Sequence, residues 1–565
     1  MREPRIFILV LTVLFISSSC KKDKQQNTQP NIILIMSDDM GYSDIGSFGG
    51  VINTPVLNGL AENGLRFTQF YNTARCCPSR ASLLTGLYPH QAGIGHMVNE
   101  GETDAYRGDL STKAVTIAEV LKQAGYATYM SGKWHVTPLK PSKENPSKHN
   151  WPLQRGFDKF FGTIHGAGSF FDPNSLTRDN EFITPSEDFY YTDAISDNAV
   201  KFIEEHESDK PFFMYLPYTA AHWPMHAKPE DIAKYKGKFD DGWDALRETK
   251  YKKMLEMGLI KPEWKLSSKG DVPDWEAEEL KGWYSSLMEV YAAMVDCMDQ
   301  GIGRVMNSLD KKGIKENTLV FFLQDNGGCA EQFGIRGSAI APYYDDVAVG
   351  DIKPMKEGEF QTEMVPKYTR DGRPVMAGKG LKPGAEDTYL SYDKPWANAS
   401  NTPFRMYKHW VHEGGISTPL IVHWPKGIKA KNEYRNQPGH LIDIMATCID
   451  VAGTSYPKTF NNNKITPLEG ISLTTAFKNE DLENRPIFWE HEGNKAVRYG
   501  KFKLVAMYKE GSEYDWELYN LESDRSETVN LIATVPEKAK ELEILWKSWA
   551  KKAGVLTWSE RQPIE

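Results

Sequence analysis

One short run of residues, Cys76-Cys77-Pro78-Ser79-Arg80, has the composition of a reactive site. Pro78 is suited to the first turn of a helix, and a helix N-terminus would place Cys76 against free backbone amides and the positive end of the helix dipole. Taken alone, the run fits a functional thiol at a helix start and a buried cysteine pair in front of a helix equally well. Other parts of the sequence must decide between these interpretations.

Oxygen-bearing side chains follow two apolar segments at the points where these segments end. Asp38 and Asp39 follow the first such segment, and Asp325 and Asn326 follow another far along the chain. Ligands of open α/β proteins bind at the carboxyl ends of the sheet strands. Four oxygen donors there suit a hard cation such as Ca²⁺ rather than zinc. The first pair alone would equally fit a turn after a strand, and the second pair favours a metal site.

Two lysines and two histidines could supply positive charge and protons. Lys133 and His135 lie in one Gly-Lys-Trp-His run, His222 lies in an Ala-His-Trp-Pro run, and Lys408 precedes Glu413-Gly414-Gly415. Imidazole titrates near neutral pH and suits acid–base catalysis, whereas ammonium groups stabilise developing negative charge. Of the other histidines, His165 and the run Glu490-His491-Glu492 are candidates for a pocket rim, and His90, His96 and His440 are predicted to be structural.

Together these segments resemble the formylglycine-dependent (type I) sulfatases. Residues Cys76 to Gly86 match the signature of that family, C-x-P-S-R-x4-T-G, at every fixed position. The cysteine at its head is converted in the family to formylglycine, an aldehyde. The proline must lie two residues later, which selects Cys76 and leaves Cys77 at a free position. The resemblance runs from about residue 31 to 531, where Leu518-Tyr519-Asn520-Leu521 and Asn530-Leu531 match the closing segment of the family.

Three departures from the family pattern are small. Ala221 stands where Pro is usual, Gln324 stands where Ser is common, and Ile416-Ser417 replaces the usual Arg after the glycine pair. None of them replaces a predicted catalytic group. They therefore concern details of the pocket rather than the chemistry.

The resemblance implies an arylsulfatase-like sulfuric ester hydrolase. A formylglycine derived from Cys76 would attack the sulfate monoester of a carbohydrate or aryl substrate and form a covalent sulfo-enzyme intermediate. One Ca²⁺ would be bound by Asp38, Asp39, Asp325, Asn326 and modified Cys76. A formylglycine-generating enzyme would be a partner during maturation.

The resemblance also implies a role for each basic residue. Lys133 and Lys408 would stabilise the sulfuryl oxygens, and Arg80 would donate hydrogen bonds to the modified residue or its neighbouring oxygens. His222 would protonate the departing alcohol. His135 would deprotonate the remaining hydroxyl so that sulfate leaves. A sulfated serine could not release sulfate in this way, because it has no second hydroxyl.

The elements that must position these residues alternate between strands and helices. This alternation predicts an α/β fold in which helices sandwich a large, mostly parallel sheet, and the resemblance implies the alkaline-phosphatase/sulfatase-like type. Strand patterns cover Asn31 to Met36, Ala127 to Met130, Phe212 to Leu216 and Thr318 to Leu323, and helix patterns cover Thr116 to Ala124 and Leu280 to Leu309.

Two domains are expected. Residues 31–483 would form the catalytic domain, with insertions at about 226–275 and 330–400, and the second insertion would form long loops over the site. Short β patterns and a helix near Pro536 to Ala550 predict a smaller C-terminal α+β domain with an antiparallel sheet over residues 484–565.

The first 20 residues predict an exported bacterial protein. Arg2 and Arg5 precede the apolar run Ile6 to Ile16, which has the length of a signal-peptide core and is too short to span a bilayer. Ser17 to Cys20 resemble a lipobox with Cys20 as the lipidated residue, although Ser17 stands where Leu is usual. Residues 21–30 are predicted to form a tether. We expect a periplasmic or cell-surface lipoprotein, with a plain cleaved signal peptide as the alternative.

Composition excludes several classes of protein. The 565 residues include 67 basic and 76 acidic side chains, a formal net charge of −9, and a pI of about 5.9, which argues against a nucleic-acid binder. Of six cysteines, five remain once Cys20 is set aside, an odd number for an oxidising compartment. Conversion of Cys76 would account for that number.

Two rival functions remain open at this point. A hydrolase of phosphate mono- or diesters could use the same fold, and a surface lipoprotein could bind glycans without activity. The two lysines and two histidines around one cysteine favour sulfate over phosphate. The intact set of predicted catalytic residues argues against a binding protein. The sugar, the sulfate position, the choice between exo and endo action and the oligomeric state are not specified by the sequence.

Overall fold

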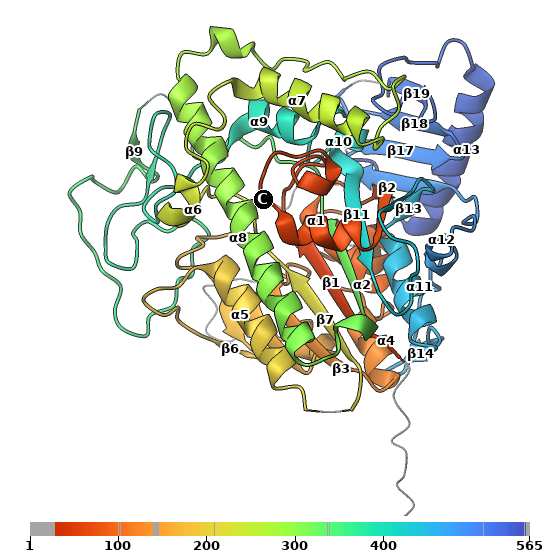
Figure 1. Ribbon diagram of the computed structural model, residues 1–565, viewed down its shortest axis with the longest axis horizontal. Helices are drawn as coiled ribbons and strands as arrows, with labels where there is room; N and C mark the ends of the chain where they lie inside the picture. Colours follow the sequence, from red (N-terminus) through yellow and green to blue (C-terminus); the bar gives the residue numbers. More distant parts are fainter. Residues whose placement is uncertain are drawn as a thin grey trace, which may run out of the picture.

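The computed structural model (Figure 1) describes residues 29–560, apart from residues 100, 102, 139–145, 208, 336, 338, 512, 513 and 559. The predicted signal segment, Cys20 and most of the tether lie outside the described residues. Within the described part of the chain, no helix is both long enough and apolar enough to cross a bilayer.

A large mixed sheet forms the centre of the molecule. Its strands follow the order β12-β2-β11-β8-β1-β7-β3-β4-β5-β6, and β13 pairs with β2. The central neighbours β8, β1, β7, β3 and β4 are all parallel, whereas β11 runs antiparallel to β2 and β8. The predicted mostly parallel sheet is therefore confirmed. The bounds are β1 Asn31–Ser37, β2 Leu65–Tyr71, β3 Ala127–Lys133, β4 Lys159–Thr163, β5 Leu176–Arg178, β6 Glu181–Phe182, β7 Phe212–Pro217, β8 Thr318–Gln324, β11 Ser417–His423, β12 Glu433–Arg435 and β13 Gly439–His440.

Helices cover both faces of this sheet, which explains why its central strands are apolar on both sides. Ile33 and Ile35 of β1 pack into one buried cluster with α8, whereas Ile32 and Leu34 pack into the opposite cluster with α2, α4 and α11. The bounds are α1 Pro55–Glu62, α2 Cys76–Thr85, α3 Pro89–Ala92, α4 Ile117–Gln123, α5 Tyr191–Glu204, α8 Lys281–Lys311, α10 Glu413–Ile416, α11 Ile442–Val451 and α12 Thr474–Phe477.

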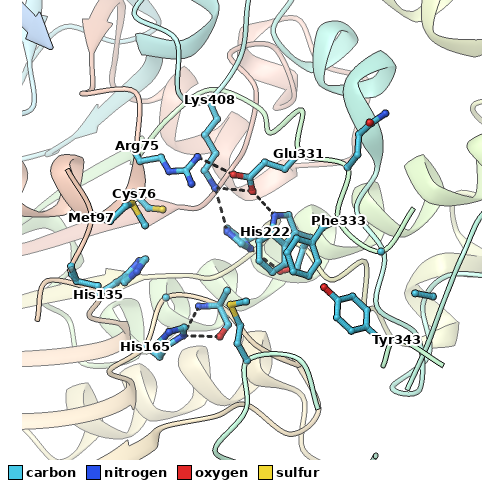
Figure 2. A pocket seen from close by; sticks show the side chains of 18 of the residues that line it. Arg75, Cys76, Met97, His135, His165, His222, Glu331, Phe333, Tyr343 and Lys408 are labelled. Carbon is cyan, nitrogen blue, oxygen red and sulfur yellow. Dashed lines mark hydrogen bonds and ion pairs between the residues drawn. The ribbon is translucent and has the colours of Figure 1, made fainter. Parts of the chain in front are cut away.

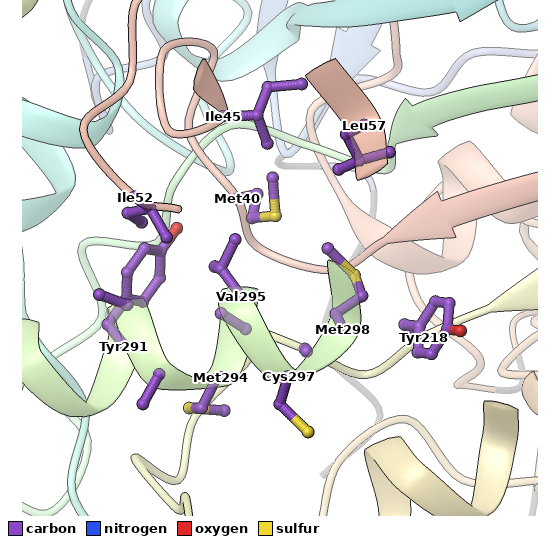
Figure 3. Close-up of a cluster of buried hydrophobic side chains, with 14 of the residues drawn as sticks. Met40, Ile45, Ile52, Leu57, Tyr218, Tyr291, Met294, Val295, Cys297 and Met298 are labelled. Atoms are coloured by element: carbon purple, nitrogen blue, oxygen red, sulfur yellow. The ribbon is translucent and has the colours of Figure 1, made fainter. Parts of the chain in front are cut away.

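The long helix α8 confirms the helix predicted over Leu280 to Leu309. Figure 3 shows how its apolar side meets the loop that follows β1. Tyr291, Val295 and Met298 face Met40 and Ile45 there, and all five side chains are buried. This packing fixes the loop that begins with the two predicted metal-binding aspartates.

A second, antiparallel sheet lies toward the C-terminus, in the order β16-β17-β18-β19. One face packs on α13 through Leu504, Leu542 and Trp546, and the other packs on the catalytic part through Trp489 and Tyr71. The predicted antiparallel sheet is confirmed, and the exact boundary at residue 484 stays a prediction. The bounds are β16 Ile487–His491, β17 Asn494–Tyr499, β18 Phe502–Ala506, β19 Trp516–Asn520 and α13 Pro536–Ala553.

The two insertions differ in secondary structure. Residues 226–275 contain the helices α6 (Pro229–Ala233) and α7 (Gly242–Glu256). The described residues of 330–400 form long loops, with the short pair β9 (Ala341–Pro342) and β10 (Met376–Ala377) before α9 (Asp393–Ser400) (Figure 1).

Candidate active site

The ends of β1 and β8 bring four oxygen-bearing side chains together. The strands are parallel and in register, with Ser37 beside Gln324, so the residues after them become neighbours. The Asn326 amide donates to Oδ1 of Asp39 over 2.7 Å, and the backbone amide of Asp39 donates to Oδ1 of Asp325 over 3.3 Å. Asp38 is fully buried beside them. The predicted clustering at two strand ends is what the structure shows.

Cys76 is the first residue of α2, as the sequence predicts. Its Sγ and carboxylate oxygens of Asp38 and Asp325 all lie within 4.8 Å of one another. Gly86 ends the same helix in a left-handed conformation with a φ of 69°, and a side chain there would collide with Leu468. The Thr-Gly end of the signature is thus a helix stop that fixes the length of α2.

Cys77 lies behind the pocket lining rather than in it. Its side chain is fully buried and belongs to the apolar cluster behind α2. Its Sγ lies 3.8 Å from Sδ of Met97 and 3.2 Å from Nε2 of His135. Cys76 alone of the pair lines the pocket described below.

Three cations surround the carboxylates. Lys133 Nζ lies 2.5 Å from Asp38, and Lys408 Nζ lies 2.9 Å from a carboxylate oxygen of Asp39. The Arg80 guanidinium, one turn after Cys76 in α2, donates to Asp325 over 2.7 Å, and its other arm donates to the backbone carbonyl of Lys133 over 3.1 Å. All three cations are buried, so this charge balance operates in a medium of low dielectric constant.

The cations and carboxylates shift the ionisation of the site. A hydrogen bond from Cys77 and the nearby charge of Lys408 lower the pKa of the Cys76 thiol well below its usual range despite its burial. Burial opposes ionisation of Asp38, but the neighbouring positive charges, that of Lys133 first, together outweigh it and lower the pKa of that carboxyl. Burial and the neighbouring Asp38 raise the pKa of Asp325 well above its usual range. Two clustered carboxylates of this kind need further positive charge to ionise together.

The carboxylate cluster fits a hard cation. Oδ1 of Asp38 and Oδ1 of Asn326 are buried and have no hydrogen-bond donor among the residues that the structure describes. Such buried acceptors are costly without a partner. Oxygen donors with free lone pairs are the ligands that Ca²⁺ prefers. The residues present therefore suit the predicted calcium ion.

His222 lies between the cations and the pocket. Its Nδ1 is 2.7 Å from the Trp223 carbonyl oxygen, and its Nε2 is 3.3 Å from Lys408 Nζ and 3.4 Å from Oδ2 of Asp39. A carbonyl oxygen can only accept a hydrogen bond, so Nδ1 carries a proton. Nε2 is therefore the atom that can gain or lose one.

His135 also lies beside Cys76 in the pocket lining (Figure 2). Gly166 allows the close approach of its ring, because a side chain at that position would meet the imidazole at 2.0 Å. Burial and the charge of Lys133 lower the pKa of His135 to about 3. The imidazole is therefore neutral at physiological pH and able to accept a proton.

A cavity of about 900 Å³ opens above Cys76, His135, His222 and Lys408. One wall is aromatic: the rings of Trp223 and Phe333 stack at 4.1 Å, and Phe333 in turn stacks on Tyr343 at 5.8 Å. Further lining residues come from three loops, at residues 97–99, 165–167 and 331–345. Parts of the second insertion thus contribute to the pocket lining.

Arg75 and Glu331 are pocket residues that sequence reasoning did not single out. Arg75 Nη1 donates to Glu331 over 2.9 Å, and the Trp223 indole donates to the other oxygen of Glu331 over 2.9 Å. Arg75 directly precedes the signature and could have been found from it. Glu331 lies in a segment without periodicity, and no sequence motif identified it as a pocket residue.

Of the two groups predicted at the pocket rim, one lies there and the other does not. His165 does line the pocket. The prediction for Glu490-His491-Glu492 is wrong, because β16 continues through His491 and the three residues turn toward His90, His96 and His409 instead of the pocket. The five described cysteines are all buried and free of disulfides.

The structure brings every predicted site residue to this one place, and their catalytic roles stay predictions. The metal set is Asp38, Asp39, Cys76, Asp325 and Asn326, and the catalytic set is Cys76, Arg80, Lys133, His135, His222 and Lys408.

Comparisons with known proteins agree with this geometry. The family model described as Sulfatase matches residues 30–454, and a model described as N-sulphoglucosamine sulphohydrolase, C-terminal, matches residues 404–551. An uncharacterized sulfatase of Schizosaccharomyces pombe is 30% identical over 94% of this chain and 95% of its own length. An arylsulfatase of Klebsiella aerogenes is 32% identical over 80% of this chain and 92% of its own length.

A solved structure in complex with its substrate, D-glucosamine-2-N,6-O-disulfate, has a similar fold. It superposes with a TM-score of 0.62 at 21% identity and covers 94% of this chain and 100% of its own. At that identity the likeness concerns the fold.

Proposed function

Because the chain belongs to the sulfatase family and is a sulfuric ester hydrolase, we propose that it removes sulfate from carbohydrate esters at a formylglycine formed from Cys76. One observation carries the proposal. Cys76 lies at the N-terminus of α2 between the pocket and the Asp38 and Asp325 carboxylates, whereas Cys77 belongs to the apolar cluster and does not line the pocket. Of the two cysteines, Cys76 is therefore the one placed to meet both a metal and a substrate.

The Cys76 thiol stands in for the hydrated aldehyde. When present, formylglycine supplies a hydroxyl nucleophile and a second hydroxyl that lets sulfate leave. The N-terminus of α2 and Lys133 favour negative charge at this position. Arg80 stays fixed between Asp325 and the Lys133 carbonyl, which holds α2 and hence residue 76 in place.

One Ca²⁺ would be held by Asp38, Asp39, Asp325, Asn326 and the modified residue 76. This ion would lower the pKa of the nucleophilic hydroxyl and neutralise the carboxylates. Support comes from the buried oxygens of Asp38 and Asn326 that have no donor in the described part of the chain.

The lysines and histidines beside the carboxylate cluster carry out the remaining steps of the reaction. Lys133 and Lys408 bind the sulfuryl oxygens and stabilise the charge that develops on them. His222 donates the proton on Nε2 to the leaving alcohol, since its Nδ1 is already committed to the Trp223 carbonyl. His135, neutral because of its depressed pKa, accepts a proton from residue 76.

The shape of the pocket favours a carbohydrate ester. A cavity of about 900 Å³ has room for a sugar unit, and the aromatic side chains of Trp223, Phe333 and Tyr343 in its lining suit the apolar side of a sugar ring. Arg75 and Glu331 at its edge offer a donor and an acceptor for ring hydroxyls. Among similar proteins, one solved structure contains a sulfated glucosamine.

We also propose that the protein is exported and anchored by a lipid at Cys20, in the periplasm or at the cell surface. The sequence of residues 1–20 supports this, and these residues lie outside the described part of the chain. A formylglycine-generating enzyme would be its partner during maturation.

A panel of sulfated mono- and disaccharides tests the substrate class. The protein co-produced with a maturing enzyme should release sulfate from at least one sugar sulfate with a higher kcat/KM than from 4-nitrophenyl sulfate. Paired phosphate esters should be turned over far more slowly. Activity restricted to aryl sulfates would contradict the carbohydrate assignment.

A further inference from the structure

A second group of metal-binding side chains lies beside the pocket but outside its lining. We call His96, His409, His491 and Glu492 the histidine cluster. Its members come from three distant parts of the chain: the loop after α3, the loop that carries Lys408, and the end of β16 with the tight turn that follows it. No function described above uses them.

The Glu492 carboxylate sits among the three imidazoles. One of its oxygens lies 2.7 Å from His96 Nε2 and 3.6 Å from His491 Nε2, and the other lies 2.6 Å from His409 Nδ1. One ligand atom each from His409, His491 and Glu492 all lie within 4.8 Å of one another. Two ligands of one tetrahedral zinc ion are roughly 3.4 Å apart, so small side-chain rotations would close this group around an ion.

His491 is the observation that points to a ligand. Its side chain is fully buried, yet neither ring nitrogen has a hydrogen-bond partner among the residues that the structure describes. A buried polar atom without a partner is costly and asks for an explanation. A buried imidazole nitrogen without a hydrogen-bond partner, close to a carboxylate, is well placed to become a metal ligand.

The donor set selects the metal. Imidazole nitrogens together with one carboxylate suit zinc, whereas calcium takes oxygen ligands. The carboxylate cluster at Cys76 has the opposite preference, because its donors are oxygens. The side chains of His409 and Glu492 are 29% and 20% exposed, which leaves an ion a path from solvent.

We propose that the histidine cluster binds one Zn²⁺ ion. The ion would join the β16–β17 turn of the C-terminal sheet to two loops of the catalytic part. Lys408 directly precedes His409, and Met97, which lines the pocket, directly follows His96. Zinc would thus stiffen one wall of the pocket without contacting the substrate. The proposal does not depend on formylglycine chemistry.

The test uses the full chain, stripped with a chelator and titrated with Zn²⁺ alone. Because zinc could also enter the carboxylate cluster, the titration is done in an Asp325→Ala background. We expect one equivalent of bound zinc that excess Ca²⁺ does not displace. Loss of a residue that merely orients a ligand costs about 10–100-fold in affinity, so loss of a ligand, in His409→Gln or Glu492→Gln, should cost at least about 100-fold.

His423→Gln is the matched control. His423 is also largely buried and contacts a backbone carbonyl, that of Asn63, rather than a carboxylate. It should leave zinc affinity unchanged. Less than one equivalent of zinc in the Asp325→Ala protein, or equal affinity in the His409→Gln and His423→Gln proteins, would overturn the proposal.

Cobalt gives a second readout without any substitution in the histidine cluster. Co²⁺ bound there should show the intense visible absorption of a four-coordinate site with nitrogen ligands, and Zn²⁺ should abolish it. A weak six-coordinate spectrum would contradict the proposed ligands.

Discussion

Replacement of His222 by alanine should separate substrates by their leaving groups. Nδ1 of His222 donates to the Trp223 carbonyl over 2.7 Å, and Nε2 faces the pocket beside Lys408 and Asp39. The Asp39 carboxylate lies 3.4 Å from Nε2. The leaving oxygen must take up a proton here if it belongs to a sugar alcohol.

General acid catalysis contributes about 10²–10⁴-fold, which corresponds to about 3–5 kcal/mol of the activation barrier. His222→Ala should therefore lower kcat/KM by about that factor for a sugar sulfate. A nitrophenolate leaves without protonation, so the loss with 4-nitrophenyl sulfate should be below about tenfold. The difference between these two losses is the predicted quantity.

The assay measures kcat/KM for wild type and His222→Ala over aryl sulfates with graded leaving-group pKa, together with one sugar sulfate. The dependence on leaving-group pKa should become steeper in the variant. His165→Ala serves as the control, because His165 lines the same pocket without a contact to Lys408 or Asp39 among its hydrogen bonds. An equal loss for every substrate in His222→Ala would refute the role of general acid.

Three further predictions follow from the same geometry. Asp325→Ala should abolish calcium binding, measured by elemental analysis, and lower turnover by at least about 10²-fold while the circular dichroism spectrum stays unchanged. Cys77→Ala should retain activity within about tenfold, in contrast to Cys76→Ala, because the Cys77 side chain lies in the apolar cluster. Buried Glu413, whose pKa is lowered to about 2 by Lys503 and other cations against the effect of burial, should contribute about 3 kcal/mol at pH 7. Since its pKa is depressed on folding, that stability should be present above about pH 4.5 and disappear toward pH 2, and urea unfolding of Glu413→Gln should lack this pH dependence.

The sequence predicts those features that depend on local patterns. Continuous apolar runs mark β1 and β8, and spacings of three and four residues mark α8, because these strands and this helix bury their side chains in fixed periods. The polar residues after β1 and β8 could be paired because parallel strands end at the same edge of a sheet. The signature identified Cys76 and Arg80, and the resemblance of later runs to the same family identified the two lysines and two histidines.

Features that depend on distant contacts were not predictable in this way. The helix α7 is charged around its circumference, and its place is fixed by a buried ion pair between Lys250 and Asp44 and by the packing of Trp243. The antiparallel placement of β11 between β2 and β8 leaves no local trace in the sequence. Glu331 lines the pocket from the loop that follows β8, a segment without periodicity.

The central claim is that residue 76 carries the nucleophile. Mass spectrometry of the peptide that spans Cys76 to Arg80, from active protein co-produced with a maturing enzyme, tests it directly, because fragment ions separate the two cysteines. The account predicts formylglycine at position 76 and an unmodified thiol at position 77. An unmodified Cys76 in fully active protein, or conversion at Cys77 instead, would contradict it.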